Sequence, residues 1–283
     1  MQIEQPIPLP VEPSDRILPL TRIVAAVIIP FLVAAFIILY FFPGETGRRF
    51  AWEIKPAMTA IWMGAGYLGG AYFFLRVLLG KRWHRVSAGF WAVTAFTWAM
   101  LLATGLHWSR FDLNNLAFQI WLVLYLVTPF LVPFVWWHNH GTSAPEAGDI
   151  PVPALARGGM AAIGVFMLIC CLICYVLPEV AISFWPWALT PLTARIMGGW
   201  FALMGVGGIV LSRKTHWSSW RYQVESIIFV WQALVLLGAF IHLSDFKPGS
   251  AWFFIAEIAV ILALLALHIA MQRQVRLAGQ QAT

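Results

Sequence analysis

The chain has 283 residues, of which 61% are hydrophobic and 11% are charged, and its formal net charge is +6 at pH 7. Soluble domains contain about 25% charged residues, so this composition excludes an ordinary soluble enzyme and predicts an integral membrane protein. In such a protein a positive net charge relates to orientation in the bilayer, and we expect no nucleic-acid partner.

Residues 1–20 contain five prolines, at positions 6, 8, 10, 13 and 19. Proline removes a backbone donor and disfavours helix, so this segment is predicted to be a Pro-rich cytoplasmic arm. A basic stretch followed by a cleavage site is missing from this segment, so we expect no removable signal peptide.

Eight apolar runs follow, each close to the roughly 20 residues that cross a hydrocarbon core. Backbone polar groups cannot stay unpaired in lipid, so each run is expected to form a helix. The fold class predicted is therefore all-α integral membrane, with eight transmembrane helices. They are placed at residues 21–42, 57–79, 86–106, 115–137, 155–177, 191–211, 221–243 and 250–271.

The two halves of the chain resemble each other. A His-x-Ser-x-Phe motif at residues 107–111 recurs at 242–246, and the same shift of 135 residues places Tyr40 on Tyr175 and Trp52 on Trp187. We predict two tandem four-helix repeats, 21–137 and 155–271, joined by a cytoplasmic linker at 138–154 and followed by a cytoplasmic tail at 272–283. Because the shift passes an even number of helices, the repeats should insert in parallel about a pseudo-two-fold axis along the membrane normal.

Basic residues indicate the orientation. With this arrangement, 12 of the 18 lysines and arginines fall on the side of the termini and six on the other side. Positive charge concentrates on the cytoplasmic side of membrane proteins, so both termini are predicted to be cytoplasmic, in the cell (inner) membrane.

Small and aromatic residues occur inside the apolar runs. Glycines at 64, 66, 69 and 70, and again at 198, 199, 205, 207 and 208, predict close helix packing. Cys170, Cys171 and Cys174 lie in one apolar run, which favours helix packing over a disulfide framework or a metal site. Most of the 16 tryptophans fit two interfacial belts, and those at 62, 98, 200 and 231 could either fill helix interfaces or pack against a flat ligand.

Two charges inside the second half have apolar counterparts in the first half. Glu257 lies about 10 Å below the outer surface at 1.5 Å per residue, and Arg195 lies one turn into the sixth run. Intramembrane charges are costly and mark functional sites. We therefore predict a tentative ligand-binding site made by Glu257, Arg195 and His242, with His107 and Gln119, around an outward-facing polar cavity. The alternative is a structural ion pair between Arg195 and Glu257.

His107 and His242 occupy equivalent positions at the outer ends of their helices. Such a pair could ligate a haem iron or a metal between the halves, or could cap helix ends. The layout is similar in outline to haem A synthase, whose two four-helix halves each hold histidines. That family needs a His pair within each half, whereas each half here offers a single outer-face His.

The sequence contains no Gly-rich phosphate loop, no His-Glu-x-x-His and no serine elbow. We therefore predict no catalytic residue and no metal site, and the sequence favours a protein that is not an enzyme. Three hypotheses stay open: small-solute or lipid handling through an outward cavity, a structural or accessory subunit of a membrane complex, and a haem- or metal-binding redox or assembly protein. The expected partner is the lipid bilayer, with other membrane subunits or a homo-oligomer as further partners. We expect no cofactor, with haem as the alternative.

Overall fold

The computed structural model describes residues 15–140 and 148–281. Within these residues the fold is helical, with no strand, and eight helices are long and apolar enough to cross a membrane. This confirms the predicted class of multi-pass helical membrane protein. The spans are α1 (Pro19–Phe41), α3 (Ala57–Leu79), α4 (Ser87–Leu106), α5 (Leu116–His138), α6 (Ala154–Val176), α8 (Pro191–Ser212), Arg221–Ile241 and α11 (Ala251–Gln281).

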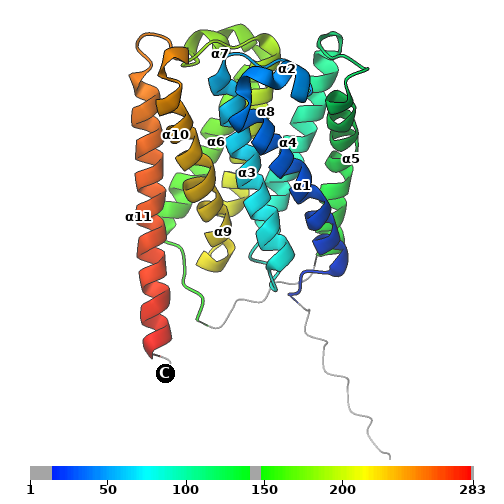
Figure 1. The fold of residues 1–283 in the computed structure, drawn as a ribbon. Helices are drawn as coiled ribbons and strands as arrows, with labels where there is room; N and C mark the ends of the chain where they lie inside the picture. The colour runs from blue at the N-terminus through cyan, green and yellow to red at the C-terminus, as the bar shows by residue number, and fades with distance from the viewer. Residues whose placement is uncertain (1–14, 141–147, 282–283) are drawn as a thin grey trace, which may run out of the picture.

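The described chain begins and ends at the same end of the bundle, at the bottom of Figure 1, which we call the terminal end. The short helices α2 (Thr46–Arg49) and α7 (Pro178–Phe184) lie at the opposite, distal end. Single turns continue the chain elsewhere between spans: η1 (Pro43–Glu45), η2 (Trp108–Arg110), η3 (Trp217–Ser219) and η5 (Leu243–Asp245).

Two spans differ from the prediction. The seventh consists of α9 (Arg221–Glu225), the π-helical segment η4 (Ser226–Gln232) and α10 (Ala233–Ile241), rather than one regular α-helix. The eighth continues to Gln281, through most of the segment expected to be a tail. Residues 272–281 are rich in Gln and Arg, which favour helix even in water.

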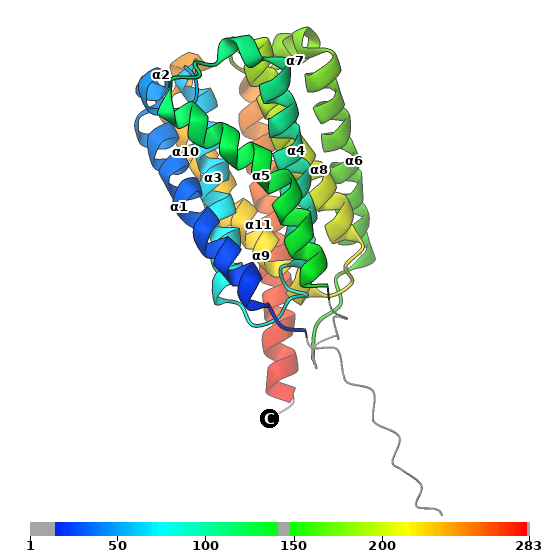
Figure 2. The same ribbon diagram turned by 90° about the vertical axis from the view of Figure 1, so that its right-hand side faces the viewer.

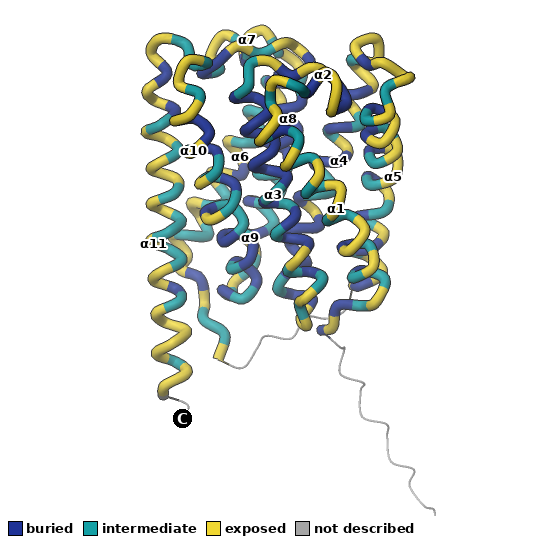
Figure 3. Tube along the Cα trace, in the orientation of Figure 1, coloured by how far each residue is buried: buried dark blue, intermediate teal, exposed yellow. Residues whose placement is uncertain are grey.

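The spans divide into inner and outer helices. α3, α4, α8 and the seventh span are the most buried, whereas α1, α5, α6 and α11 are largely exposed. Figure 3 shows this as dark inner helices beside yellow outer ones. The exposed side chains of the outer helices are mostly large and apolar, as hydrocarbon contact requires.

Glycines allow close contact where helices cross. A Cβ on Gly164 of α6 would lie 2.9 Å from the carbonyl oxygen of Gly205 on α8, and one on Gly64 of α3 would lie 3.1 Å from the backbone nitrogen of Tyr40. Neither backbone can admit a larger residue without moving. The outer helices α1 and α6 therefore pack tightly on the inner helices α3 and α8.

The helix α5 stands apart from α1 between its two ends (Figure 2), and it contains Pro129 and Pro133. Proline removes a helix hydrogen bond and bends the axis. At the terminal end, the side chain of Asn139 accepts hydrogen bonds from the backbone of Leu18 (2.8 Å) and from Thr21 Oγ1 (2.7 Å). At the distal end, Asn115 donates to the carbonyl of Phe50 over 3.1 Å. α5 is thus tied to the start of α1 at the terminal end and to the segment that follows α2 at the distal end.

Candidate functional site

A cavity of about 1670 Å³ opens among the helices of the bundle, and both buried and exposed residues line it. All eight spans contribute to its wall, and most of the residues that line it are apolar. Pockets for drug-sized ligands measure about 300–1,000 Å³, so this space exceeds the usual size. Its chemistry suits an apolar or amphipathic molecule rather than a small ion.

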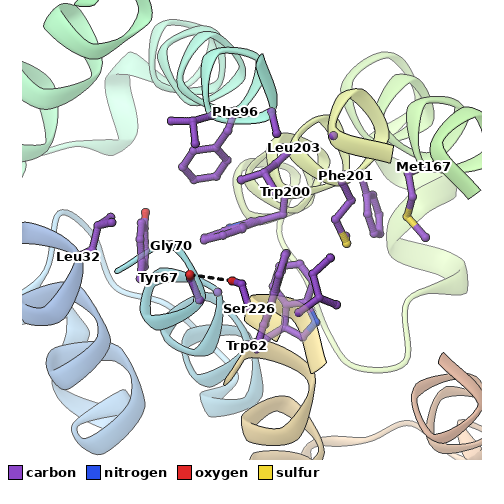
Figure 4. A pocket seen from close by; sticks show the side chains of 18 of the residues that line it. Leu32, Trp62, Tyr67, Gly70, Phe96, Met167, Trp200, Phe201, Leu203 and Ser226 are labelled. Carbon is purple, nitrogen blue, oxygen red and sulfur yellow. Dashed lines mark hydrogen bonds between the residues drawn. The ribbon is translucent and has the colours of Figure 1, made fainter. Parts of the chain in front are cut away.

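Three tryptophans form the centre of the cavity wall. The ring centroids of Trp62 and Trp231 lie 5.1 Å apart, and those of Trp200 and Trp231 also lie 5.1 Å apart. Figure 4 shows Trp62, Trp200, Tyr67 and Phe96 around this space. The indole nitrogens of Trp200 and Trp231 are buried and have no hydrogen-bond partner within residues 15–140 and 148–281. Such unpaired buried donors are uncommon and are suited to a ligand that brings an acceptor.

The π-helical segment η4 brings polar side chains to the same wall. Ser226 donates a hydrogen bond to the carbonyl of Gly69 (2.8 Å), which is the dashed line in Figure 4. Gln232 Nε2 donates to Glu257 Oε2 of α11 over 2.7 Å, and both residues line the cavity. π-Helical turns occur often at functional sites, because they shift side chains off the regular helical positions. We take η4, the three tryptophans and Glu257 as the candidate site.

The predicted ion pair between Arg195 and Glu257 is not formed. Both residues are described, and no carboxylate lies within ion-pair distance of Arg195. The reason is that α8, which carries Arg195, and α11, which carries Glu257, pack against different helices. α8 packs between α4 and α6, whereas α11 packs against η4 and α10. The sequence places Arg195 and Glu257 at a similar depth in the membrane, but the two side chains lie at different helix interfaces.

Arg195 contacts the other half of the chain at His107. Its Nη1 lies 2.8 Å from His107 Nε2, and its Nε donates to the carbonyl of Tyr175 over 3.1 Å. A guanidinium can only donate, so Nε2 of His107 must accept and the imidazole must be neutral. Burial, and then the positive charges of Arg195 and Arg110, lower the pKa of His107, which lies just beyond the end of α4.

The other predicted site residues lie apart from the cavity. Of the five, all within the described residues, Glu257 alone lines it. Gln119 is exposed and donates to the carbonyl of Leu113 over 2.9 Å. His242 is half-buried, and its side chain forms no hydrogen bond with any residue that the structure describes. An outward polar cavity shared by these five residues is therefore not the arrangement found, and their roles in ligand binding stay predictions.

One residue of the candidate site is missing from the sequence prediction. Gln232 is the partner of Glu257, and its signal is an amide within the apolar run 221–243, which also contains Gln223. The tryptophans at 62, 200 and 231 were singled out, but Trp98 was grouped with them although it is 45% exposed and packs on Phe130. An indole facing lipid cannot be distinguished by sequence from one facing a cavity.

A polar cluster at the terminal end was also missed. His84 Nδ1 pairs with Asp15, His84 Nε2 lies 3.0 Å from Ser218 Oγ, and Ser218 Oγ donates to Asp149. The order Asp, His, Ser is found in nucleophilic sites, but here the serine proton is directed to a second carboxylate. The cluster therefore joins segments far apart in sequence rather than activating a nucleophile.

The described residues contain no group of three or more His, Cys, Asp or Glu side chains that could hold a metal ion together. The three cysteines, all described, are free thiols.

Comparison with protein-family models, with curated proteins and with solved structures finds no match to this chain. The function is therefore inferred from the cavity and the residues that line it.

Proposed function

We propose that this multi-pass membrane protein takes a lipid-like molecule from the bilayer into its central cavity. The observation that carries the proposal is the volume of about 1670 Å³ and its apolar wall. An apolar wall rewards removal of hydrocarbon from water but gives little to a hydrated solute. Of small-solute and lipid handling, the cavity therefore favours lipid handling.

Access in the plane of the membrane fits the arrangement of the outer helices. Ile28 and Phe31 of α1 line the cavity, and so do Leu124 and Thr128 of α5. These residues lie between the hydrogen bonds of Asn139 with α1 at the terminal end and the hydrogen bond of Asn115 with Phe50 at the distal end. A chain-like molecule could therefore pass between these helices from the hydrocarbon core without crossing a headgroup layer.

The second half offers a similar passage. Ile163 and Phe166 of α6 line the cavity together with Ala259 and Ala263 of α11. Each of these four residues lies 135 positions after a residue of the first half that also lines the cavity. Those residues are, in the same order, Ile28, Phe31, Leu124 and Thr128. Two lateral passages, one in each half, would let a molecule enter from either flank.

The candidate site supplies a polar anchor for such a molecule. Glu257 and Gln232 are hydrogen-bonded to each other, and the indole N–H groups of Trp200 and Trp231 have no partner in the described part of the chain. A few placed polar groups in an apolar cavity orient a ligand without excluding its tail. We infer that the ligand carries a small polar head with a hydrogen-bond acceptor.

We also propose that the chain is a tandem duplication inserted in parallel. Helix bounds support this, because α1 and α6 begin 135 residues apart and end 135 residues apart. Packing supports it as well: the ring centroids of Trp52 and Phe111 are 5.8 Å apart, and those of their counterparts Trp187 and Phe246 are 5.4 Å apart. The charge bias toward the terminal end supports cytoplasmic termini in a cell membrane.

Native mass spectrometry of the protein extracted in mild detergent tests the function. We expect a co-purified mass in the range of membrane amphiphiles. The substitution Ala256→Phe fills the wall of the cavity and should reduce its occupancy. The matched control is Ala266→Phe, which places the same ring on an exposed position of the same helix outside the cavity lining.

Equal occupancy in the two variants would contradict the proposal, as would wild-type protein without any bound amphiphile. An absorption spectrum of the same sample addresses the haem alternative, because a Soret band would favour that reading instead.

A further inference from the structure

Arg195 is a half-buried cation without a counterion among the residues that the structure describes. Both groups that contact it are neutral: the imidazole of His107 at 2.8 Å and the carbonyl of Tyr175 at 3.1 Å. Arg110 adds a further positive charge nearby, since it acts electrostatically on the same imidazole. Charges at this depth in a membrane normally pair with an opposite charge. The contacts within the protein leave Arg195 without one.

An apolar groove adjoins this cation. A pocket of about 460 Å³ lies between α4 and α6, with a wall that includes Trp98, Leu102, Leu168 and Leu172. Trp98, Leu102 and Leu172 are exposed on the outside of the bundle, where hydrocarbon is expected. Tyr175 belongs to both features, because it lines the groove and its carbonyl holds Arg195. The groove and the guanidinium thus have Tyr175 as a common neighbour.

A hydrogen bond joins the two helices that form the groove. The hydroxyl of Tyr175 donates to the carbonyl of Ala99 over 2.5 Å, which ties α6 to α4. The groove shares no lining residue with the central cavity, whose lining also includes neither Arg195 nor Tyr175.

We propose that Arg195 binds the phosphate of an anionic phospholipid, in the leaflet at the distal end, with one acyl chain in the groove between α4 and α6. Guanidinium groups bind phosphate in a forked geometry, and a phosphate supplies the missing counterion. The apolar groove below the cation selects a lipid over a soluble anion. This site is independent of the central cavity and of the function proposed for it.

The position related to this site by the 135-residue shift provides a comparison within the same chain. The residue 135 positions before Arg195 is Ala60, and the counterpart of His107 is His242. The symmetry-related position therefore combines His242 of the second half with Ala60 of the first half, and it has no guanidinium. We expect one anionic lipid per chain at this level rather than two.

Competition between phosphatidylglycerol and phosphatidylcholine, followed by native mass spectrometry, tests the proposal. Wild-type protein should retain phosphatidylglycerol preferentially, and Arg195→Gln should lower that preference roughly tenfold, through the loss of a charge-assisted contact. Arg195→Lys should keep most of it. The control is Arg48→Gln, because Arg48 is exposed at the same end but already pairs with Glu45.

A groove variant guards against misfolding of Arg195→Gln. Leu172→Trp fills the groove from an exposed position, keeps the charge, and should also reduce retention of phosphatidylglycerol. The proposal is overturned if wild-type protein shows no headgroup preference, or if Leu172→Trp and a folded Arg195→Gln both behave as wild type. It is also overturned if inorganic phosphate displaces the lipid, since the site would then belong to a soluble anion. Ala256→Phe should leave this site unchanged, so failure here and failure of the cavity proposal can be distinguished.

Discussion

Tyr40 and Tyr175 lie 135 residues apart and make reciprocal hydrogen bonds across the molecule. The hydroxyl of Tyr40 donates to the carbonyl of Leu234 over 3.0 Å, and that of Tyr175 donates to the carbonyl of Ala99 over 2.5 Å. The two acceptors are also 135 residues apart. Each half thus holds the other at the same place, as expected for two repeats about a shared axis.

If these bonds are equivalent, removing either hydroxyl should have the same effect. Tyr40→Phe and Tyr175→Phe should each lower the free energy of unfolding by about 1 kcal/mol, the usual net value of one hydrogen bond. The double variant should show the sum, because the two bonds share no partner. Thermal or denaturant unfolding in detergent measures all three. A large loss for one tyrosine and none for the other would argue against equivalent repeats.

Glu257 and Arg195 should behave as energetically independent residues. Their side chains have separate partners, so the effects of Glu257→Leu and Arg195→Leu on stability should add within about 0.5 kcal/mol. In contrast, Glu257→Leu should couple to Gln232→Leu, because Gln232 donates to Glu257 over 2.7 Å. Two double-mutant cycles measure both quantities. A strong coupling energy between Glu257 and Arg195 would contradict this prediction, because it would indicate an ion pair between the two side chains.

Acidification should weaken the contact between His107 and Arg195. Burial and the charges of Arg195 and Arg110 lower the pKa of His107 in the folded protein. A lowered pKa means that the unfolded chain binds the proton more readily, so this contribution is complete above the unfolded value of about 6.5 and is lost as the pH falls through the folded pKa. The melting temperature of wild-type protein should therefore drop over this range more than that of His107→Gln. Gln keeps an acceptor for Arg195 but does not titrate, so parallel profiles would exclude this role for His107.

Reporter fusions test the proposed orientation. Reporters inserted at residue 45 and residue 145 and fused to the C-terminus should report outside, inside and inside, because the terminal end carries most of the positive charge. An inverted order would contradict this orientation and would place the distal end, with the Arg195 site, on the cytoplasmic side of the membrane.

The spans could be predicted from sequence because lipid allows so few backbone structures. Hydrophobicity alone located α1 and α6 within two residues of their observed ends. The partners of Arg195 and Glu257 could not be predicted in this way. A residue count gives depth in the membrane, whereas the facing helix depends on how the bundle packs. That packing directs Arg195 to His107 and Glu257 to Gln232.

The π-helical segment η4 illustrates a second limit. No proline or glycine occurs in residues 226–232, so the local sequence reads as regular helix. The segment instead packs on α3, where Ser226 bonds to the carbonyl of Gly69. This contact joins η4 to a distant part of the chain, and the last residue of the segment, Gln232, lies beside Glu257.

Photo-crosslinking in membranes tests the central claim most directly. A membrane-dissolved amphiphile with a diazirine near the end of its alkyl chain is activated in the bilayer, and the labelled peptides are identified by mass spectrometry. If a lipid-like molecule occupies the cavity, adducts should appear on the inner residues 226–232 of η4 and 66–70 of α3, and Ala256→Phe should reduce them. Adducts confined to the outward faces of α1, α5, α6 and α11 would show that the molecule stays outside and would contradict the account.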